Sequence, residues 1–284
     1  MPVDILLCEG VDRSPDVRVL NKLLGGLCTV EPSGSKHRMD DQILVRRRVS
    51  PASVVMGLRD PDFDRAWTAP SDVPENWSKA TGGSPGIPLG WRWSRKEIEN
   101  YLIDPAVVMP ALGVRAPPPS DYQQILDRAA DRLSAYTAAR VALTRHRIHW
   151  RPLPNRWGRP RGSDRYPFPD NLRRKECRKR IRSLVRRYTA PARLDPAVVL
   201  REFTAQYQQH RPSTGLWRIH FLHTYGGKDL LLQMENDLQS FGFNNFAEFR
   251  ERILLGIRDS SEDIAFWLPE WNALKNVIQT YIPR

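Results

Sequence analysis

Residues 5–10 read Ile-Leu-Leu-Cys-Glu-Gly, and residues 54–64 read Val-Val-Met-Gly-Leu-Arg-Asp-Pro-Asp-Phe-Asp. Each stretch is a short apolar run that ends in carboxylates. Parallel strands buried on both faces have continuous apolar runs, and such sheets bind ligands at the carboxyl ends of their strands. Carboxylates that converge there repel one another unless a hard cation such as Mg²⁺ neutralises them. The two stretches therefore predict two buried strands and a divalent metal site.

The residues around these runs alternate between strand and helix patterns. We expect strands at 4–8, 27–30 and 54–58, and helices from Ser14-Pro15-Asp16 to Gly25 and over 39–47. This alternation predicts right-handed crossovers and an α/β fold with a parallel sheet and flanking helices. Residues 68–90 are rich in proline and glycine, which predicts an irregular excursion before a fourth strand at 91–94 and helical turns at 96–102.

The run Ala-Pro-Pro-Pro-Ser at residues 116–120 is the best candidate for a domain boundary. We expect a catalytic α/β domain over 1–115 and a mainly helical region over 116–284. Residues 152–169 are predicted to be a loop. Apolar residues at helical spacing predict helices over 121–146, 173–188, 196–207, 227–241, 246–255 and 262–281.

The charge of the chain is uneven. Its 284 residues include 44 Lys and Arg against 32 Asp and Glu, a formal net charge of +12, and much of the excess lies between Arg140 and Arg187. A concentrated basic segment predicts a polyanionic partner, most simply nucleic acid, although an acidic partner protein also accounts for it. The candidate nucleic-acid-binding residues are Arg156, Arg159, Arg173, Arg174, Lys175, Arg178, Lys179, Arg182 and Arg186.

Composition excludes several other classes of protein. No apolar run approaches the roughly 18–20 residues of a membrane span, so no membrane association is expected. The three cysteines are far apart and lack metal-binding spacing, which argues against a disulfide framework and fits a reducing cytoplasm.

Two later motifs extend the pattern of the two acidic strands. Residues 97–102 read Glu-Ile-Glu-Asn-Tyr-Leu, and residues 226–231 read Gly-Gly-Lys-Asp-Leu-Leu. The series resembles a Toprim domain, the catalytic fold of topoisomerases, primases and OLD-type nucleases. It is most similar to a bacterial Toprim-like family related to the OLD nucleases and often found with ATPases in anti-phage defence systems. The resemblance covers residues 1–104, and beyond them it depends on the glycine-lysine-aspartate run.

The resemblance implies roles for individual residues. Glu9, Asp60 and Asp62 match the metal-binding carboxylates of Toprim domains, and Glu99 is implied to belong to the same catalytic site. Glu97 and Glu99 point to different faces of a helix, and spacing alone does not choose between them. Lys228 is the candidate for the lysine that OLD nucleases carry late in the domain.

One position departs from the family. The aspartate expected four residues after the first glutamate is replaced by Arg13, which Asp12 and Asp16 flank. Either aspartate is a candidate ligand for a second metal, and we expect Asp16. If neither binds, a two-metal mechanism is in doubt.

Together these features predict an endonuclease that depends on Mg²⁺ or Mn²⁺ and cleaves DNA, transfer RNA or another RNA. The resemblance implies a partner ATPase that controls it. The alternative is a non-catalytic subunit that binds nucleic acid or an ATPase. The sequence leaves open whether the chain forms a homodimer.

Overall fold

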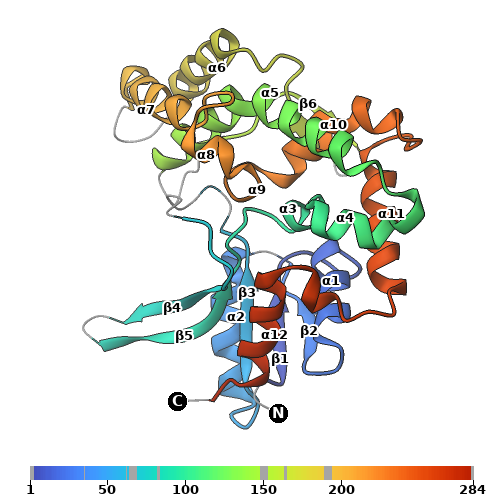
Figure 1. Ribbon diagram of the computed structural model, residues 1–284. Coiled ribbons are helices and arrows are strands. Elements are labelled where there is room, and N and C mark those ends of the chain that lie inside the picture. The colour runs from blue at the N-terminus through green and yellow to red at the C-terminus, as the bar shows by residue number, and fades with distance from the viewer. Residues whose placement is uncertain are drawn as a thin grey trace. The chain divides into compact units, whose positions relative to one another are not determined.

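A computed structural model describes residues 3–34, 36–61, 63, 69–81, 84–147, 153–162, 165–188 and 194–282. The chain divides into two compact units (Figure 1). The first comprises residues 1–61, 69–116 and 250–284, and the second comprises residues 62–68 and 117–249. We describe each unit by itself.

The first unit contains a five-stranded sheet and the helices around it. In chain order its elements are β1 Ile5–Cys8, α1 Pro15–Leu24, β2 Thr29–Pro32, α2 Lys36–Val49, β3 Val55–Arg59, β4 Glu75–Thr81, β5 Ser84–Arg92, α3 Glu99–Leu102, α4 Pro105–Leu112, the 3₁₀ helix η1 Gly113–Arg115, the 3₁₀ helix η2 Ile264–Trp267 and α12 Pro269–Gln279.

The strand order in the sheet is β2-β1-β3-β5-β4. The pairs β1–β2, β1–β3 and β3–β5 are parallel, and β4 joins the edge antiparallel to β5. Cys8 is in register with Leu58, so the residues that follow these two strands lie at the same edge of the sheet. This arrangement confirms the α/β fold with a mostly parallel sheet and flanking helices.

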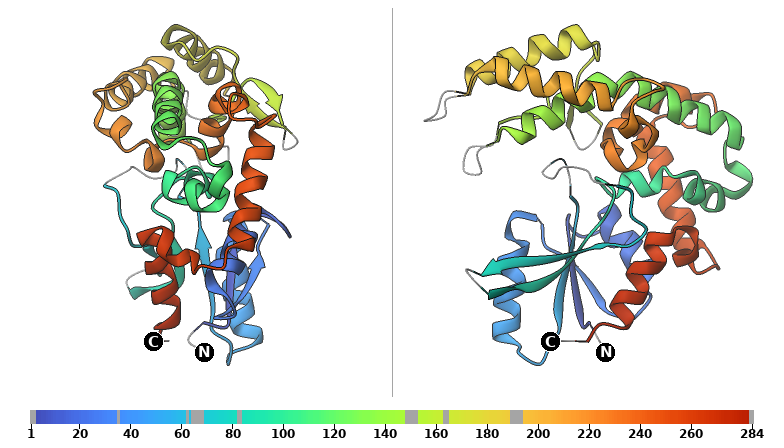
Figure 2. Two further views of the ribbon diagram at one scale, coloured as in Figure 1. Left: turned by 45° about the vertical axis from the view of Figure 1, so that its right-hand side comes forward. Right: turned by 60° about the vertical axis from the view of Figure 1, so that its left-hand side comes forward.

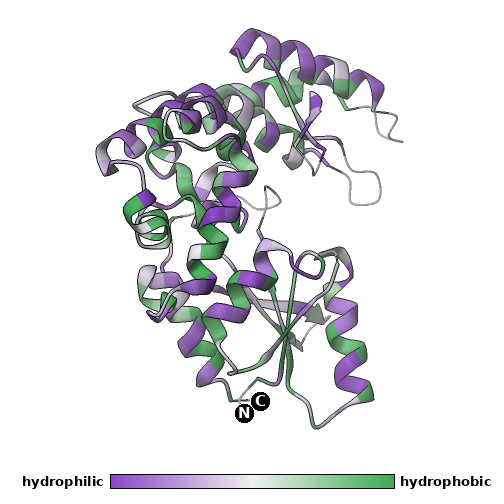
Figure 3. Cartoon of the chain, turned by 90° about the vertical axis from the view of Figure 1, so that its right-hand side faces the viewer, coloured by the Kyte–Doolittle hydropathy of each residue, from purple (hydrophilic) through white to green (hydrophobic). Residues whose placement is uncertain are grey.

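Helices cover both faces of the sheet (Figure 2). On one face, α2 buries the cluster Leu7, Met39, Ile43, Val55, Trp77 and Leu89. On the opposite face lie α1 and α12. Since the alternate residue Leu6 is also fully buried, β1 is apolar on both sides, as its continuous apolar run predicts. In the hydropathy view of Figure 3, the strands at the centre of the sheet are mostly green.

The prediction of an irregular excursion over 68–90 was wrong for most of that segment. Residues 75–81 and 84–92 form the antiparallel strands β4 and β5, and residues 91–92, predicted as part of a separate strand, end β5. The prolines of the strands, Pro85 and Pro88, lie in β5 before Gly90, where its pairing with β3 begins, and the pairing with β4 shifts register twice between Trp77 and Thr81. These prolines therefore cost no hydrogen bond to β3. Gly90 has φ +143°, and a Cβ there would lie 1.9 Å from the Gly57 carbonyl oxygen, so only glycine permits this β3–β5 contact.

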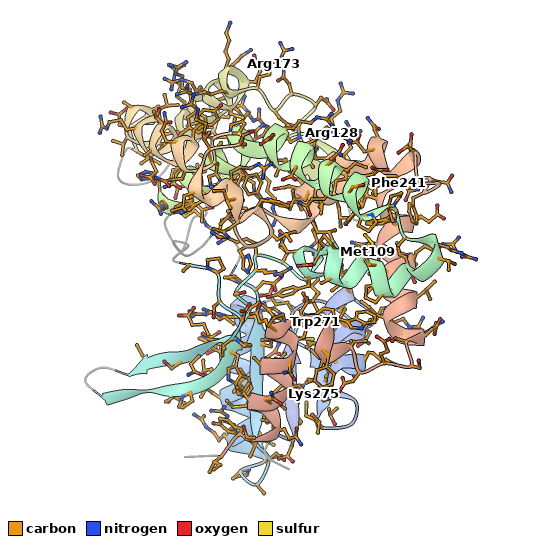
Figure 4. All side chains as sticks on the ribbon, viewed as in Figure 1. Met109, Arg128, Arg173, Phe241, Trp271 and Lys275 are labelled. Carbon is orange, nitrogen blue, oxygen red and sulfur yellow. The ribbon has the colours of Figure 1, made fainter. Side chains whose placement is uncertain are left out.

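The C-terminal segment returns to the first unit, which differs from the predicted division at residue 116. The Glu270 carboxylate on α12 accepts hydrogen bonds from the Ser94 backbone N–H (2.7 Å), the Ser94 hydroxyl (2.6 Å) and the Tyr101 hydroxyl (2.6 Å). Next to it, the buried Trp271 ring (labelled in Figure 4) stacks on Tyr101. Residues 250–284 therefore complete the sheet domain.

The second unit is mainly helical and is organised around α5, which contacts α6, α7 and α10. Residues 152–169, predicted as a loop, include a short antiparallel hairpin, β6–β7. The last helix of the unit, α11, continues into the first unit from Arg250. The elements are α5 Pro119–Arg145, β6 Arg159–Arg161, β7 Tyr166–Phe168, α6 Arg174–Arg187, α7 Pro196–Gln209, α8 Leu216–Ile219, α9 Phe221–Thr224, α10 Gly227–Gln239 and α11 Phe246–Asp259.

Candidate metal centre and nucleic-acid interface

Glu9 and Asp60 lie together at the carboxyl ends of β1 and β3. The backbone N–H of Asp60 donates a hydrogen bond to Glu9 Oε1 at 3.0 Å, which turns the Glu9 side chain towards the end of β3. Both residues are half-buried. The adjacent parallel strands thus bring the Glu9 carboxylate to the backbone of Asp60, which is 51 positions away in the sequence.

The turn after β1 brings a third carboxylate close. Gly10 has φ +95°, and a Cβ there would lie 2.4 Å from Ser14 Oγ and 3.9 Å from Asp16 Oδ2. Glycine lets the start of α1 approach the end of β1 so closely. Asp16 is half-buried beside this turn, whereas Asp12 is exposed. Of the two aspartates, Asp16 is therefore better placed to act with Glu9.

The charges of all three acids affect the pKa of the buried Cys8 thiol. Burial raises the pKa of Cys8 far above its usual value, and the nearby charges of Asp16, Asp60 and Glu9 raise it further. The side chain is 1% exposed, so Cys8 is a protonated core residue and not a nucleophile. Three carboxylates thus act on one point at the sheet edge.

Residues 60–64, Asp-Pro-Asp-Phe-Asp, are called the acidic comb below. Its other two aspartates, Asp62 and Asp64, lie outside the described residues. Among the residues that the structure does describe, no three or more His, Cys, Asp and Glu side chains are arranged to hold a metal ion. The donor chemistry nevertheless fits Mg²⁺ or Mn²⁺, since Glu9, Asp60 and Asp16 offer only carboxylate oxygens and are open enough to admit water ligands.

Glu99 is buried at the start of α3, with 2% of its surface exposed. Its Oε1 lies 3.4 Å from Arg250 Nη1 at the start of the C-terminal segment. Glu97 is equally buried, and its backbone N–H donates to Asn100 Oδ1 at 3.0 Å. Burial does not distinguish the two glutamates, and the assignment of Glu99 to the metal site stays a prediction.

Lys228 is the second residue of α10 in the second unit and is half-buried. The N-terminus of a helix favours bound anions, because its first N–H groups and its dipole both face them. The neighbouring Asp229 is completely buried and forms an ion pair with Arg140. The role of Lys228 beside the carboxylates also stays a prediction.

The basic helix α6 has two distinct sides. Cys177, Ile181 and Val185 are buried against the rest of the second unit. Two of the arginines also contact α7, since Arg178 Nη1 lies 3.5 Å from Thr204 Oγ1 and the Arg174 guanidinium lies 4.7 Å from the centre of the Tyr207 ring. The helix is mostly purple in Figure 3, and Arg173 is labelled at its start in Figure 4. Its exposed cations are Arg173, Arg174, Lys175, Lys179, Arg182, Arg186 and Arg187.

The segment before α6 adds fewer cations to this surface than its composition suggests. Arg159 is exposed but lies 3.6 Å from Asp170, and the half-buried Arg156 stacks on the Tyr166 ring at 4.8 Å. Trp157 is buried, with its ring centre 4.7 Å from that of Tyr136. Trp157 therefore anchors the segment to the core and is not available to stack on a nucleic-acid base.

Sequence reasoning missed the partners of two motif residues. Arg140 pairs with Asp229 although 89 positions separate them, and Arg250 pairs with Glu99 across 151 positions. The only local signal for Arg140 is its place four residues after Tyr136, on an otherwise apolar face of α5.

No family model matches this chain, and no curated protein matches it either. Within the described ranges, none of the helices combines the length and the apolar character needed to cross a membrane.

Proposed function

We propose that this protein is a Mg²⁺-dependent endonuclease. The observation that supports the proposal is the hydrogen bond between the Asp60 backbone and the Glu9 carboxylate, because it joins two acidic residues at the carboxyl edge of a parallel sheet. Ligands bind at this edge in open α/β folds. Asp16 adds a third acid to the same neighbourhood.

In this proposal Glu9, Asp60 and Asp62 hold the metal, Asp16 is the candidate ligand for a second one, and Glu99 belongs to the same catalytic site. A bound Mg²⁺ supplies an activated water and stabilises charge on the phosphate. Lys228, at the start of α10, binds a phosphate oxygen. The exposed cations of α6 bind the nucleic-acid backbone.

The biological setting is inferred from the resemblance to OLD-related Toprim proteins. On that basis the chain acts in the cytoplasm as the effector of an anti-phage defence system, and a partner ATPase controls it. The substrate is DNA, transfer RNA or another RNA.

A second candidate is a non-catalytic subunit that binds nucleic acid. The exposed basic side of α6 favours it, because this surface binds a polyanion whether or not the chain cleaves it. The two candidates differ in their response to metal, since only the first requires a carboxylate site that binds Mn²⁺.

The test is a cleavage assay with purified protein on single-stranded DNA, duplex DNA, transfer RNA and unstructured RNA, each with Mg²⁺, Mn²⁺ or EDTA. We expect metal-dependent cleavage of at least one substrate. Asp60→Asn should abolish it, while Asp121→Asn, at an exposed acid on α5, should not. Equal cleavage by wild type and Asp60→Asn would refute the proposal.

A further inference from the structure

The interior of the second unit contains an ion pair that is completely removed from solvent. The side chains of Arg140 on α5 and Asp229 on α10 are both 0% exposed. Arg140 Nη1 donates to Asp229 Oδ2 and to the Tyr166 hydroxyl (3.1 Å), and the Tyr166 hydroxyl donates to Asp229 Oδ1 at 3.0 Å. Three side chains from α5, β7 and α10 therefore form a closed polar network.

The face of the same guanidinium holds an aromatic ring from the acidic comb. The Arg140 Cζ lies 4.1 Å from the centre of the Phe63 ring, and Phe63 is 3% exposed. In the sequence Phe63 stands between Asp62 and Asp64 and three positions after Asp60. Within residues 62–68 the structure describes Phe63, and this is the residue that Arg140 contacts.

The edge of the guanidinium fixes the start of α10. A Cβ at Gly226 would lie 2.8 Å from Arg140 Nη1 and 2.9 Å from Asp229 Oδ2, so the backbone that leads into the helix closes directly on the ion pair. Lys228 stands between this glycine pair and Asp229 in the sequence. The ion pair therefore also determines where the backbone of Lys228 lies within the second unit.

A buried ion pair is weak grounds for stability alone, since apolar residues of similar volume often serve as well. This pair differs because Arg140 also contacts Phe63, which follows the candidate ligand Asp62, and approaches Gly226, which precedes Lys228 by two residues. A planar guanidinium can hold a ring on its face and a carboxylate at its edge at the same time, which a lysine ammonium cannot do.

We propose that Arg140 is a positioning residue that holds the Phe63 end of the acidic comb and the Lys228 end of α10 in one fixed arrangement. The proposal rests on the nuclease function proposed above. A displacement of about 1 Å in a catalytic group can lower the rate on the order of 100-fold. Loss of the Phe63 contact should therefore lower kcat far more than it weakens nucleic-acid binding.

The experiment compares Phe63→Leu, which removes the ring face but keeps an apolar side chain, with Phe243→Leu. Phe243 is a matched control because it is also buried in the second unit, where its ring packs on Phe249 at 4.9 Å. We measure kcat, KM for the cleaved substrate, the Mn²⁺ concentration for half-maximal rate, and Tm. Phe63→Tyr, which keeps a ring face over Arg140, tests for rescue.

We expect Phe63→Leu to lower kcat on the order of 100-fold and to raise the Mn²⁺ requirement. Its KM and Tm should stay close to those of Phe243→Leu, and Phe63→Tyr should recover most of the rate. Equal kcat in Phe63→Leu and Phe243→Leu overturns the positioning role and leaves the nuclease proposal intact. Wild-type protein without metal-dependent cleavage overturns both.

If Phe63→Leu does not fold, Arg140→Lys replaces it, because this variant keeps the charge beside Asp229 but loses the planar face. The positioning role then requires folded Arg140→Lys protein with lowered kcat and unchanged KM. Wild-type kcat in that variant overturns it.

Discussion

The acids at the sheet edge of the first unit and the buried Asp229 of the second unit have different surroundings. In the first, Glu9, Asp60 and Asp16 are half-buried, and all three raise the pKa of the same thiol, so like charges act together. In the second, Asp229 is completely buried and is bound by one arginine and one tyrosine. Asp229 therefore belongs to a closed network of protein groups, whereas carboxylates whose charges add at one point are suited to bind a cation from solution.

The largest loss of stability is expected when the buried pair of Arg140 and Asp229 is broken. Asp229→Ala leaves Arg140 as an uncompensated charge in the core and should lower the free energy of unfolding by about 3–5 kcal/mol. Asp237→Ala is the control on the same helix, because it removes only exposed ion pairs with Arg128 and Arg132. That control should lose about 1 kcal/mol or less. Urea denaturation measures both values, and similar losses in the two variants would contradict the contrast.

The second largest effect is the stabilisation by Mn²⁺ that we expect from the acids at the sheet edge of the first unit. Mn²⁺ at a hundred times its Kd should stabilise the wild-type protein by about 2.7 kcal/mol. Asp60→Asn should lose this increment, and in EDTA it should be at least as stable as wild type because one of several like charges is gone. Calorimetry with and without Mn²⁺ measures the difference. An unchanged Mn²⁺ increment in Asp60→Asn would refute the metal site, and Asp121→Asn serves as the control.

Substitutions on the basic side of α6 are expected to change nucleic-acid binding by a smaller amount. Lys179→Gln combined with Arg182→Gln should weaken nucleic-acid binding and lower the slope of log K against log salt by about 0.9 for each lost duplex contact. Binding titrations between low and moderate salt measure the slope. The same slope in the double variant and in Arg128→Gln, an exposed cation on α5, would place the binding surface elsewhere.

The smallest effect is a pH dependence in the first unit. Burial raises the pKa of Glu270 above its usual 4.5, in spite of hydrogen bonds from Ser94 and Tyr101 that lower it. A carboxyl whose folded-state pKa is raised contributes stability below its unfolded pKa and loses that contribution as the pH rises through the folded value. Glu270→Gln has no such titration. The stability of this variant relative to wild type should therefore increase from pH 4 upwards, as denaturation at several pH values would show; a constant difference would contradict the shift.

The strands β1 and β3 could be predicted because both are buried on two faces and need continuous apolar runs. Helix α1 could be predicted because Ser14, Pro15 and Asp16 form a local start signal. The β4–β5 hairpin could not, since an edge hairpin tolerates the prolines and glycines that otherwise indicate a loop.

The candidate site divides in the same way. Glu9 and Asp60 are close because each follows the end of a parallel strand. Each strand end can be predicted from a short apolar run that ends in an acid. The Arg140 contacts depend on three elements far apart in the chain, and a single arginine on an apolar helix face does not indicate which residues it will meet. Long-range pairs of this kind depend on the packing of the whole unit, so local sequence patterns do not predict them.

The return of α12 to the sheet has a consequence for the order in which the protein folds during synthesis. Residues 117–249 leave the ribosome as one nearly continuous unit and can fold while translation proceeds. Glu270 and Trp271 follow that unit in the chain, so their contacts with Ser94 and Tyr101 form only after residues 117–249 have been synthesised. The second unit can therefore fold before the contacts that attach α12 to the first unit are made.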